Sequence, residues 1–489
     1  MTRISKSFQT GLSNFANELR KRLTSTRTAA GHSNLGRGAF GNRDRSKFVT
    51  YGTYAVRNQT ITILLYIAAS ATISLFIPRV AYAAQTPTPL PEVWIAVRKD
   101  GHAGKGTKAD PYEGNTPAKF DARMASFGPN TQIHLGAGTF QTNLGTRTWI
   151  VKNGWQISGA GMYLTTLQAV GNVSAIHGGL AVLDNQYPSF ATTPGNIAIR
   201  DLTLDGNKPG LTMPTGSGGE YDLCVLGVRL AGSHNLVERV RTQNTYGTAA
   251  NNRECFAIML TGYASTETVD ATIRFCRVEN MLGSYGNPFS ISGWPATGNF
   301  MTGVKVYGNI AIGVNDRRTG TASTNSGGVN GGNVKYLDVF DNQFDDCEGF
   351  FHFDTGTFDH VRIFNNVGKR LWNGVNVVGV TGCTNLEIRD NKATIQNRIV
   401  GSGVTGLAVN GGITGLVITG NTITYDSSGA GRNHFFPIYA GEGKIVNARV
   451  EANTFSDGAD GITGHFTSSI FRGNGTDTGG TSTFLQDTR

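Results

Sequence analysis

The sequence predicts an all-β solenoid, because a short alternating strand that runs into an Asn-containing turn recurs from residue 196 to the C-terminus. The phrase occupies residues 196–207, 334–344, 385–393, 415–423 and 447–455. Self-similarity at a period of about 20 to 35 residues is typical of repeat architectures. The spacing suits one coil of a parallel β-helix per repeat, with a loop of variable length in each coil.

Within each phrase Val, Ile, Leu and Phe alternate with polar residues, which gives a strand with one apolar face. A second strand often follows the variable loop and ends in Gly, as in residues 225–232, 256–262 and 406–411, so each coil should contribute at least two strands. The turn asparagines are Asn280, Asn309, Asn342, Asn366, Asn391, Asn421, Asn453 and Asn474.

Asparagine at such a corner tolerates left-handed backbone angles and can hydrogen-bond its own backbone. Asparagines stacked on successive coils can also form an amide ladder along the axis. We therefore expect the turn asparagines to adopt left-handed angles and to form such a ladder.

The composition divides the chain into three parts. Residues 1–55 are basic and rich in Ser, Thr and Gly, which predicts a disordered extension. An alternative hypothesis places the true start at Val56, which would leave this extension untranslated. Residues 56–83 contain an apolar stretch followed by Ala81-Tyr82-Ala83, the pattern of a cleaved export signal. Residues 84–489 form the predicted β-helix domain.

The apolar stretch 61–77 is shorter than the roughly 20 residues that a membrane span needs. Cleavage and release to the periplasm, the cell surface or the medium is therefore the first interpretation. A retained signal anchor, which would be the chain's only membrane contact, is the alternative. The sequence leaves the oligomeric state open.

The net charge of +9 comes from the N-terminal part of the chain. Residues 1–83 contain twelve Lys or Arg and two Asp or Glu, which leaves 31 basic and 32 acidic residues in the remainder. Phosphate binding needs a concentrated basic surface on the folded domain. The charge balance therefore argues against a nucleic-acid partner.

All five cysteines lie beyond the export signal, at Cys224, Cys255, Cys276, Cys347 and Cys383. Disulfides would be allowed after export, but an odd number leaves one thiol over. The favoured interpretation is that they are small buried apolar residues inside the coil, and a disulfide framework is the alternative.

Three N-terminal segments, 94–101, 106–112 and 131–140, resemble the start of pectin-lyase-like right-handed parallel β-helix proteins. In that superfamily a first strand, a Gly-Thr-containing loop and a capping helix precede the next strand. Residues 117–127 would be that helix, with Pro117 in its first turn. The resemblance implies a right-handed parallel β-helix with an N-terminal capping helix, and a long-chain carbohydrate lying along its axis.

Chemistry-bearing residues gather in segment 345–356. In an extended segment Phe351 and Phe353 would face the core, while His352 and Asp354 would project outward. Crowded carboxylates raise one another's pKa or hold a cation such as Ca²⁺, and a nearby His or Arg supplies a base or a charge clamp. The candidate catalytic residues are Asp345, Asp346, Glu348, His352, Asp354 and Arg370. The alternative is a solvated loop with turn-forming Asp residues.

Two function classes remain. The first is a polysaccharide lyase or glycoside hydrolase that acts on an acidic glycan, and the second is a non-catalytic surface or adhesion protein. The segment lacks the full signatures of polygalacturonase-like enzymes and of calcium-dependent pectate lyases. Loop aromatics could form sugar-stacking platforms or pack in the core. They are Tyr285, Trp294, Trp372, His434, Phe435 and Phe436.

Overall fold

The computed structural model describes most of the chain from residue 89 onward. The described residues are 89–143, 151–171, 180–185, 195–207, 210–211, 225–245, 254–262, 267–281, 285–293, 300–314, 328–347, 349–396, 404–426, 435–456, 462–476 and 485–487. The predicted extension and export signal, residues 1–83, lie outside them. Residues from Thr88 onward belong to one compact unit.

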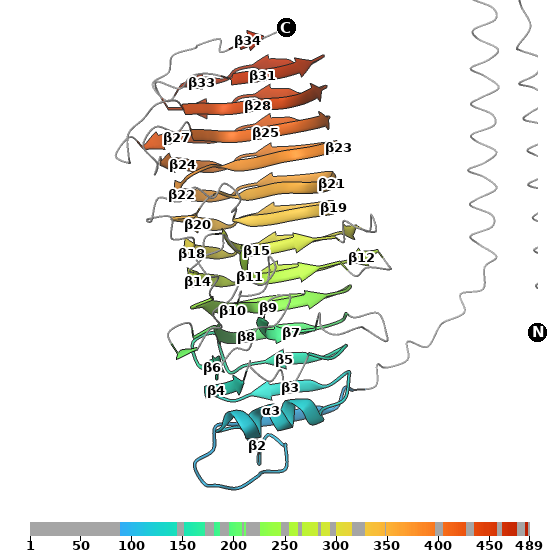
Figure 1. The fold of residues 1–489 in the computed structure, drawn as a ribbon, viewed down its shortest axis with the longest axis vertical. Helices are drawn as coiled ribbons and strands as arrows, with labels where there is room; N and C mark the ends of the chain where they lie inside the picture. Colours follow the sequence, from blue (N-terminus) through green and yellow to red (C-terminus); the bar gives the residue numbers. More distant parts are fainter. Residues whose placement is uncertain are drawn as a thin grey trace, which may run out of the picture. The chain divides into compact units, whose positions relative to one another are not determined.

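This unit is a right-handed parallel β-helix, as the sequence predicts. Each coil adds one strand to each of three sheets that run along the axis, and strands on successive coils pair in parallel (Figure 1). Parallel strands joined by crossovers are almost always right-handed, because the strand twist favours that path. The backbone N–H and C=O groups of one coil are thereby satisfied by its neighbours.

The first sheet contains β7 (Leu180–Asp184), β9 (Val225–Ala231), β11 (Glu254–Thr261), β15 (Tyr285–Ser292), β25 (Val404–Thr414), β28 (Phe435–Val446), β31 (Ile462–Thr467), β34 (Leu485–Asp487) and the N-terminal parts of β19 (Val329–Phe340), β21 (Phe351–Phe364) and β23 (Val375–Arg389).

The second sheet contains β2 (Tyr112–Glu113), β1 (Glu92–Ala96), β3 (Gln132–Leu135), β5 (Gln156–Ser158), β13 (Thr272–Arg274), β17 (Lys305–Tyr307), β26 (Val417–Thr419), β29 (Arg449–Glu451), β32 (Ile470–Arg472), the N-terminal parts of β8 (Ala198–Asp205) and β10 (Leu236–Gln243), and the C-terminal parts of β19, β21 and β23.

The third sheet contains β4 (Gly138–Asn143), β6 (Thr165–Val170), β14 (Arg277–Met281), β18 (Ile310–Val314), β20 (Gln343–Asp345), β22 (Val367–Leu371), β24 (Lys392–Gln396), β27 (Thr422–Asp426), β30 (Thr454–Phe455), β33 (Gly475–Thr476) and the C-terminal parts of β8 and β10. The short strands β12 (Thr268–Val269) and β16 (Met301–Thr302) lie between the first and second sheets.

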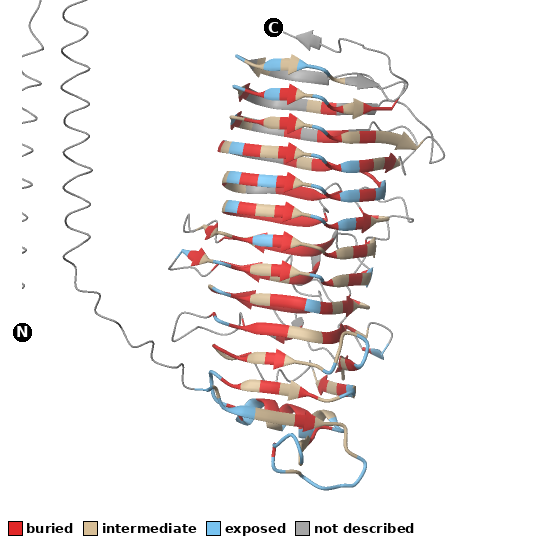
Figure 2. Cartoon of the chain, turned by 180° about the vertical axis from the view of Figure 1, so that it is seen from behind, coloured by how far each residue is buried: buried red, intermediate tan, exposed pale blue. Residues whose placement is uncertain are grey.

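The core is built from side chains that stack coil on coil. On the second sheet a single inward row has no exposed surface: Ile199, Val237, Ile273, Val306, Val339, Ile363, Ile388, Ile418 and Val450. Buried and partly exposed residues alternate along the strands, as the period-two pattern predicts (Figure 2). Each such aliphatic side chain contributes about 1.5–3 kcal/mol through burial.

The bends between sheets use single residues in the left-handed conformation. At the bend from the second to the third sheet this residue has φ between 51° and 67°: Asp201, Arg239, Phe275, Gly308, Asp341, Asn365, Asp390, Gly420, Ala452 and Gly473. Left-handed backbone costs a residue with a Cβ about 1–2 kcal/mol. The chain must nevertheless change direction within one residue at this bend. Hydrogen bonds to the neighbouring coil therefore hold the residue at its positive φ.

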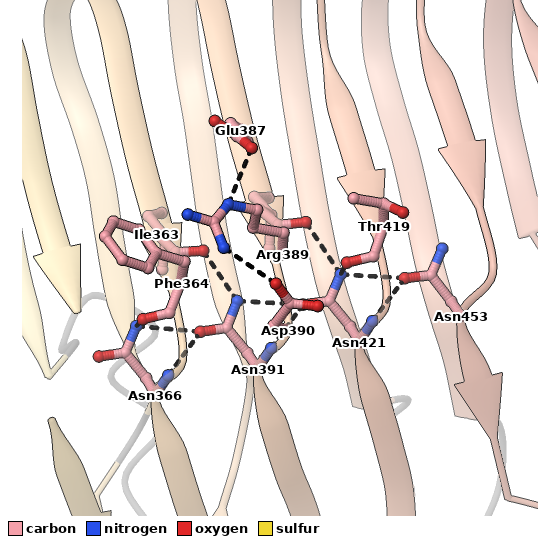
Figure 3. A network of polar contacts seen from close by, with 11 residues as sticks. Ile363, Phe364, Asn366, Glu387, Arg389, Asp390, Asn391, Thr419, Asn421 and Asn453 are labelled. Atoms are coloured by element: carbon pink, nitrogen blue, oxygen red, sulfur yellow. Dashed lines mark hydrogen bonds and ion pairs between the residues drawn. The ribbon is translucent and has the colours of Figure 1, made fainter. Parts of the chain in front are cut away.

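The predicted amide ladder is present immediately after that bend. Nδ2 of each asparagine donates to Oδ1 of the asparagine on the next coil at 2.9–3.0 Å, over Asn309, Asn342, Asn366, Asn391, Asn421, Asn453 and Asn474. Figure 3 shows the part from Asn366 to Asn453. Six of the seven are buried.

Two details of the ladder prediction were wrong. The left-handed residue is the one before each ladder asparagine and not the asparagine itself, because the ladder amide must point inward along the stack. Asn280 is not a member, since it is an exposed left-handed residue within β14. Cys276 occupies the ladder position of that coil, and its backbone N–H donates to Oδ1 of Asn309 at 2.8 Å.

The helix α3 (Pro117–Ser126) caps the N-terminal end of the β-helix, within one residue of the prediction (Figure 1). The Thr116 side chain accepts a hydrogen bond from the Lys119 amide at its N-terminus. Phe120 and Met124 are fully buried. Asp121 accepts hydrogen bonds from the Thr142 hydroxyl and the Asn143 amide of β4 at 2.7 and 3.0 Å, which fixes the helix to the first coil.

Across the described part of the chain no helix is both long and apolar enough to cross a membrane. Cys276, Cys347 and Cys383 are buried, which agrees with their interpretation as small core residues. Cys224 and the side chain of Cys255 lie outside the described residues.

Candidate functional site

The predicted residues of segment 345–356 begin with an ion pair on the outer face of the third sheet. Asp345 ends β20, and its Oδ1 accepts from Nε and Nη2 of Arg370 in β22 at 2.8 and 2.7 Å. The hydrogen bond to Asp345 raises the pKa of Arg370. Because the two side chains are 38% and 52% exposed, water screens much of their attraction.

Asp346 follows at the corner of the same coil, with left-handed backbone at φ 58°. Its amide donates to the Lys369 carbonyl at 3.1 Å, and its carboxylate adds to the negative field at Arg370. The structure therefore brings Asp345, Asp346 and Arg370 together at one exposed corner. Their arrangement is equally consistent with the alternative interpretation, a solvated loop with turn-forming Asp residues.

His352 lies on a different face of the coil, in the first sheet. Its side chain is on the opposite side of β21 from the core residues Phe351 and Phe353, as the alternation predicts. It is nonetheless only 1% exposed. In register it stands between Asn330 and Asn376, and Nδ1 lies 3.3 Å from Nδ2 of Asn376.

The acidic corner and the histidine are consequently separate places, because the buried residues Cys347 and Phe350 occupy the bend between the two sheets. Glu348 and the side chain of Asp354 lie outside the described residues. Among the described side chains there is no group of three His, Cys, Asp or Glu residues that could hold a metal ion.

The outward row of the first sheet that contains His352 is polar over several coils. Ser290, Asn330 and His352 are in register and are 1%, 8% and 1% exposed. Further along the same row Asn376 and Tyr439 are partly exposed, and Ala408 stands in register between them. The row therefore passes from buried polar groups to partly exposed ones, and neutral hydrogen-bonding side chains dominate it.

The outward face of the second sheet is different, because its side chains contact one another. Tyr307, Phe340 and Phe364 form a parallel stack with centroid distances of 4.7 and 4.9 Å. The Arg389 guanidinium lies over Phe364 at 4.3 Å, and it also pairs with Glu387 and Asp390 (Figure 3). The ring faces are occupied, so this stack offers mainly ring edges to a ligand.

Of the aromatics considered as sugar platforms, Trp372 is only 8% exposed and packs in the core. The other five residues, or their side chains, lie outside the described part. Sequence reasoning did not single out the stack of Tyr307, Phe340 and Phe364. Its signal is an aromatic residue at the same place in three successive repeats, two residues before the ladder asparagine.

No protein-family model matches the chain, and no curated protein matches its sequence. Among solved structures, the A-module of mannuronan C-5 epimerase AlgE4 from Azotobacter vinelandii is 16% identical, with 78% of this chain and 99% of that chain covered and a TM-score of 0.33. The family 28 exopolygalacturonase of Yersinia enterocolitica is 12% identical, with 79% and 78% covered and a TM-score of 0.43.

The GH136 lacto-N-biosidase of Eubacterium ramulus is 9% identical, with 79% of this chain and 67% of that chain covered and a TM-score of 0.44. These proteins share the parallel β-helix fold with this chain. At such identities the likeness extends to the fold alone, and one fold hosts many chemistries. The role of each residue is therefore inferred from its contacts, burial and charge in this structure.

Proposed function

We propose that this protein is an exported polysaccharide-binding β-helix protein, and that an extended glycan lies along the outward face of the first sheet. The observation that carries the proposal is the in-register polar row of Ser290, Asn330, His352 and Asn376 on four successive coils. After one coil that contributes Ala408, the row continues with Tyr439. A solenoid presents an extended surface with a regular repeat, and an extended glycan is a polymer with a regular repeat of hydroxyl groups.

The neutral character of the row suits this ligand. Amide, hydroxyl and imidazole groups can both donate to and accept from sugar hydroxyls. Asn376 and Tyr439 are partly exposed and form the accessible part of the row. A tyrosine adds an apolar ring surface on which a sugar can pack.

Cleavage of the glycan by lyase or hydrolase chemistry is the catalytic form of this proposal. His352 would then act as the acid or base, a role that positioned histidines often take. Asp345, Asp346 and Arg370 lie on another sheet, so in this form they would bind an outer segment of the glycan and would not share a reacting atom with His352. Whether binding or cleavage requires calcium is tested separately in the screen described below.

A rigid, non-catalytic surface spacer is the second candidate. The outward face of the second sheet from β17 to β21 favours it, since ion pairs and stacked rings there stiffen the coils and leave few groups for a ligand. A spacer would show no dependence on the first-sheet row.

The deciding experiment is a screen of the purified protein against acidic and neutral polysaccharides, with and without calcium. It follows binding, new absorbance from unsaturated products, and reducing ends. Asn376→Ala should weaken binding at least about tenfold, the loss of one or two hydrogen bonds. Gln343→Ala, at an exposed position of β20 on the third sheet, is the matched control. If both variants bind as tightly as the wild type, or if no glycan binds, the non-catalytic spacer becomes the favoured function.

A further inference from the structure

A serine, a histidine and a glutamate meet on the second sheet, at the opposite end of the solenoid from the C-terminal coils. Glu92, His134 and Ser158 belong to β1, β3 and β5, three successive coils. The Ser158 Oγ lies 2.9 Å from Nδ1 of His134. On the other side of the ring, Oε1 of Glu92 lies 2.9 Å from Nε2.

We propose that Ser158, His134 and Glu92 form a second functional site, which hydrolyses a carboxylic ester through an acyl-serine. A nucleophilic hydroxyl bonded to a base, with that base bonded to a carboxylate, is the arrangement by which such sites are recognised on unrelated folds. Nothing in this proposal depends on the polysaccharide row of the first sheet.

The surroundings hold the imidazole in one orientation. Trp94 is in register with His134, and the two rings stack with centroids 4.2 Å apart and planes 18° apart. Lys108 lies over the Trp94 ring at 5.3 Å. A base whose rotamer is fixed by packing needs little reorganisation before it accepts a proton.

The carboxylate of Glu92 would select the ring nitrogen that carries the proton. An acceptor beside Nε2 favours the tautomer that carries its proton there, which leaves the Nδ1 lone pair to accept from the Ser158 hydroxyl. Glu92 lies off the line of the Nε2–H bond, so this contact is an ion-pair distance and not a well-aligned hydrogen bond. Such contacts often tighten only when a substrate is bound.

A positive group stands on the next coil. Arg200 of β8 is in register with Ser158, so it lies one strand spacing away, about 4.8 Å, on the same face. Its side chain is 38% exposed, and its ion pair with Glu238 is long at 3.4 Å. Arg200 is therefore suited to stabilise the negative charge that develops on an ester carbonyl oxygen.

The site is reachable from solvent. His134 and Glu92 are 24% and 55% exposed, and Ser158 is partly exposed. The turn that follows Ser158 carries Tyr163 and Leu164, which are 66% and 61% exposed. These apolar side chains would favour an acyl ester over a charged substrate.

The reaction consumes only the ester and water. Ser158 Oγ bonds to the ester carbonyl carbon while its proton passes to Nδ1 of His134. The bond from that carbon to the alcohol oxygen then breaks, and the proton returns to the departing alcohol. Water repeats the sequence on the acyl-serine and releases the acid, so the net reaction converts ester and water into acid and alcohol.

The test uses the full-length protein with two probes, 4-nitrophenyl acetate and a fluorophosphonate that labels activated serines. We expect hydrolysis, and a label that peptide mass mapping places on Ser158. Ser158→Ala should abolish the label and lower the hydrolysis rate at least about 100-fold, and His134→Gln should slow labelling by a similar factor. Ser126→Ala, which removes an exposed helix-end hydroxyl, should behave as the wild type.

Mapping the label on the wild type needs no variant, so the result does not depend on how a variant folds. No label, a label on another serine, or unchanged hydrolysis in Ser158→Ala would overturn the proposal. Glu92→Gln should lower kcat with KM unchanged, because Glu92 positions the base and does not touch the ester. Neither probe contains a polysaccharide, so failure here leaves the proposed function untouched.

Discussion

Nδ2 of Asn391 donates a hydrogen bond to Oδ1 of Asn421 on the next coil at 3.0 Å (Figure 3). Nδ2 also donates to the Ile363 carbonyl of the preceding coil at 2.9 Å, and Oδ1 of Asn391 accepts from the amide and side chain of Asn366. One buried side chain therefore joins three coils. All its polar atoms are paired, so its loss would leave several buried partners unsatisfied.

Replacing Asn391 with Ala should lower the free energy of unfolding by about 2–4 kcal/mol, because each buried polar group left unpaired costs about 1–3 kcal/mol. Chemical denaturation measures the change. Lys392→Ala, at the exposed neighbouring position, should shift it by less than about 0.5 kcal/mol. Equal effects of the two changes would contradict a stabilising role for the ladder.

Ala452 has a left-handed backbone, φ 54°, at a bend where the coils on either side have Gly420 and Gly473. We expect Ala452→Gly to stabilise the protein by about 0.5–1 kcal/mol, since relief of the left-handed strain exceeds the entropy that glycine adds to the unfolded chain. Thermal unfolding would show this as a higher midpoint. Ala448→Gly, at a buried position without a positive φ, should lower it. A lower midpoint for both variants would show that the bend carries no strain.

Phe340 is stacked between Tyr307 and Phe364, with interplanar angles of 6° and 2°. Phe340→Ala removes both stacks and should cost about 1–3 kcal/mol, since each aromatic pair contributes about 0.5–1.5 kcal/mol beyond burial. A double-mutant cycle with Phe364→Ala measures the coupling in denaturant. Additive effects of the two substitutions would mean that the rings do not stabilise each other.

Burial raises the pKa of the Cys276 thiol from 9.0 to about 12. The folded thiol therefore keeps its proton at a pH where the unfolded thiol has lost it, so this residue contributes stability below about pH 9 that is lost as the pH rises toward about 12. Between these values the free energy of unfolding should fall less steeply for Cys276→Ala than for the wild type. Identical slopes would show that this thiol is accessible or titrates normally. In the wild type at pH 8, alkylation of Cys276 should require denaturant.

The coil and most of the ladder could be predicted because their signals are local, whereas the capping helix was expected from the family resemblance. Alternation of Val or Ile with polar residues decides which face of a strand is buried, and this pattern is visible within a segment of a few residues. Pro117 is a local signal for the start of α3, and the structure adds Thr116 as its N-terminal cap. Asn280 was misassigned because asparagine favours both left-handed turns and ladder positions, and residue type alone does not separate these two environments.

The candidate site was harder to predict, since it depends on which coils and which sheets the side chains share. Asp345 and His352 are seven residues apart in sequence, and they lie on different sheets because a buried bend separates them. Asp345 and Arg370, 25 residues apart, form an ion pair because Asp345 and Lys369 are in register.

By itself the sequence determined the repeat, the inward face of the strands and the predominantly neutral character of the body, because these follow from local pattern and composition. Only the tertiary structure decided that Ser158, His134 and Glu92 meet, since loops of unequal length separate them and the parallel register alone places them side by side. In a solenoid, the hydrogen-bond register between coils brings together residues that are far apart in sequence. A local sequence pattern does not contain that information.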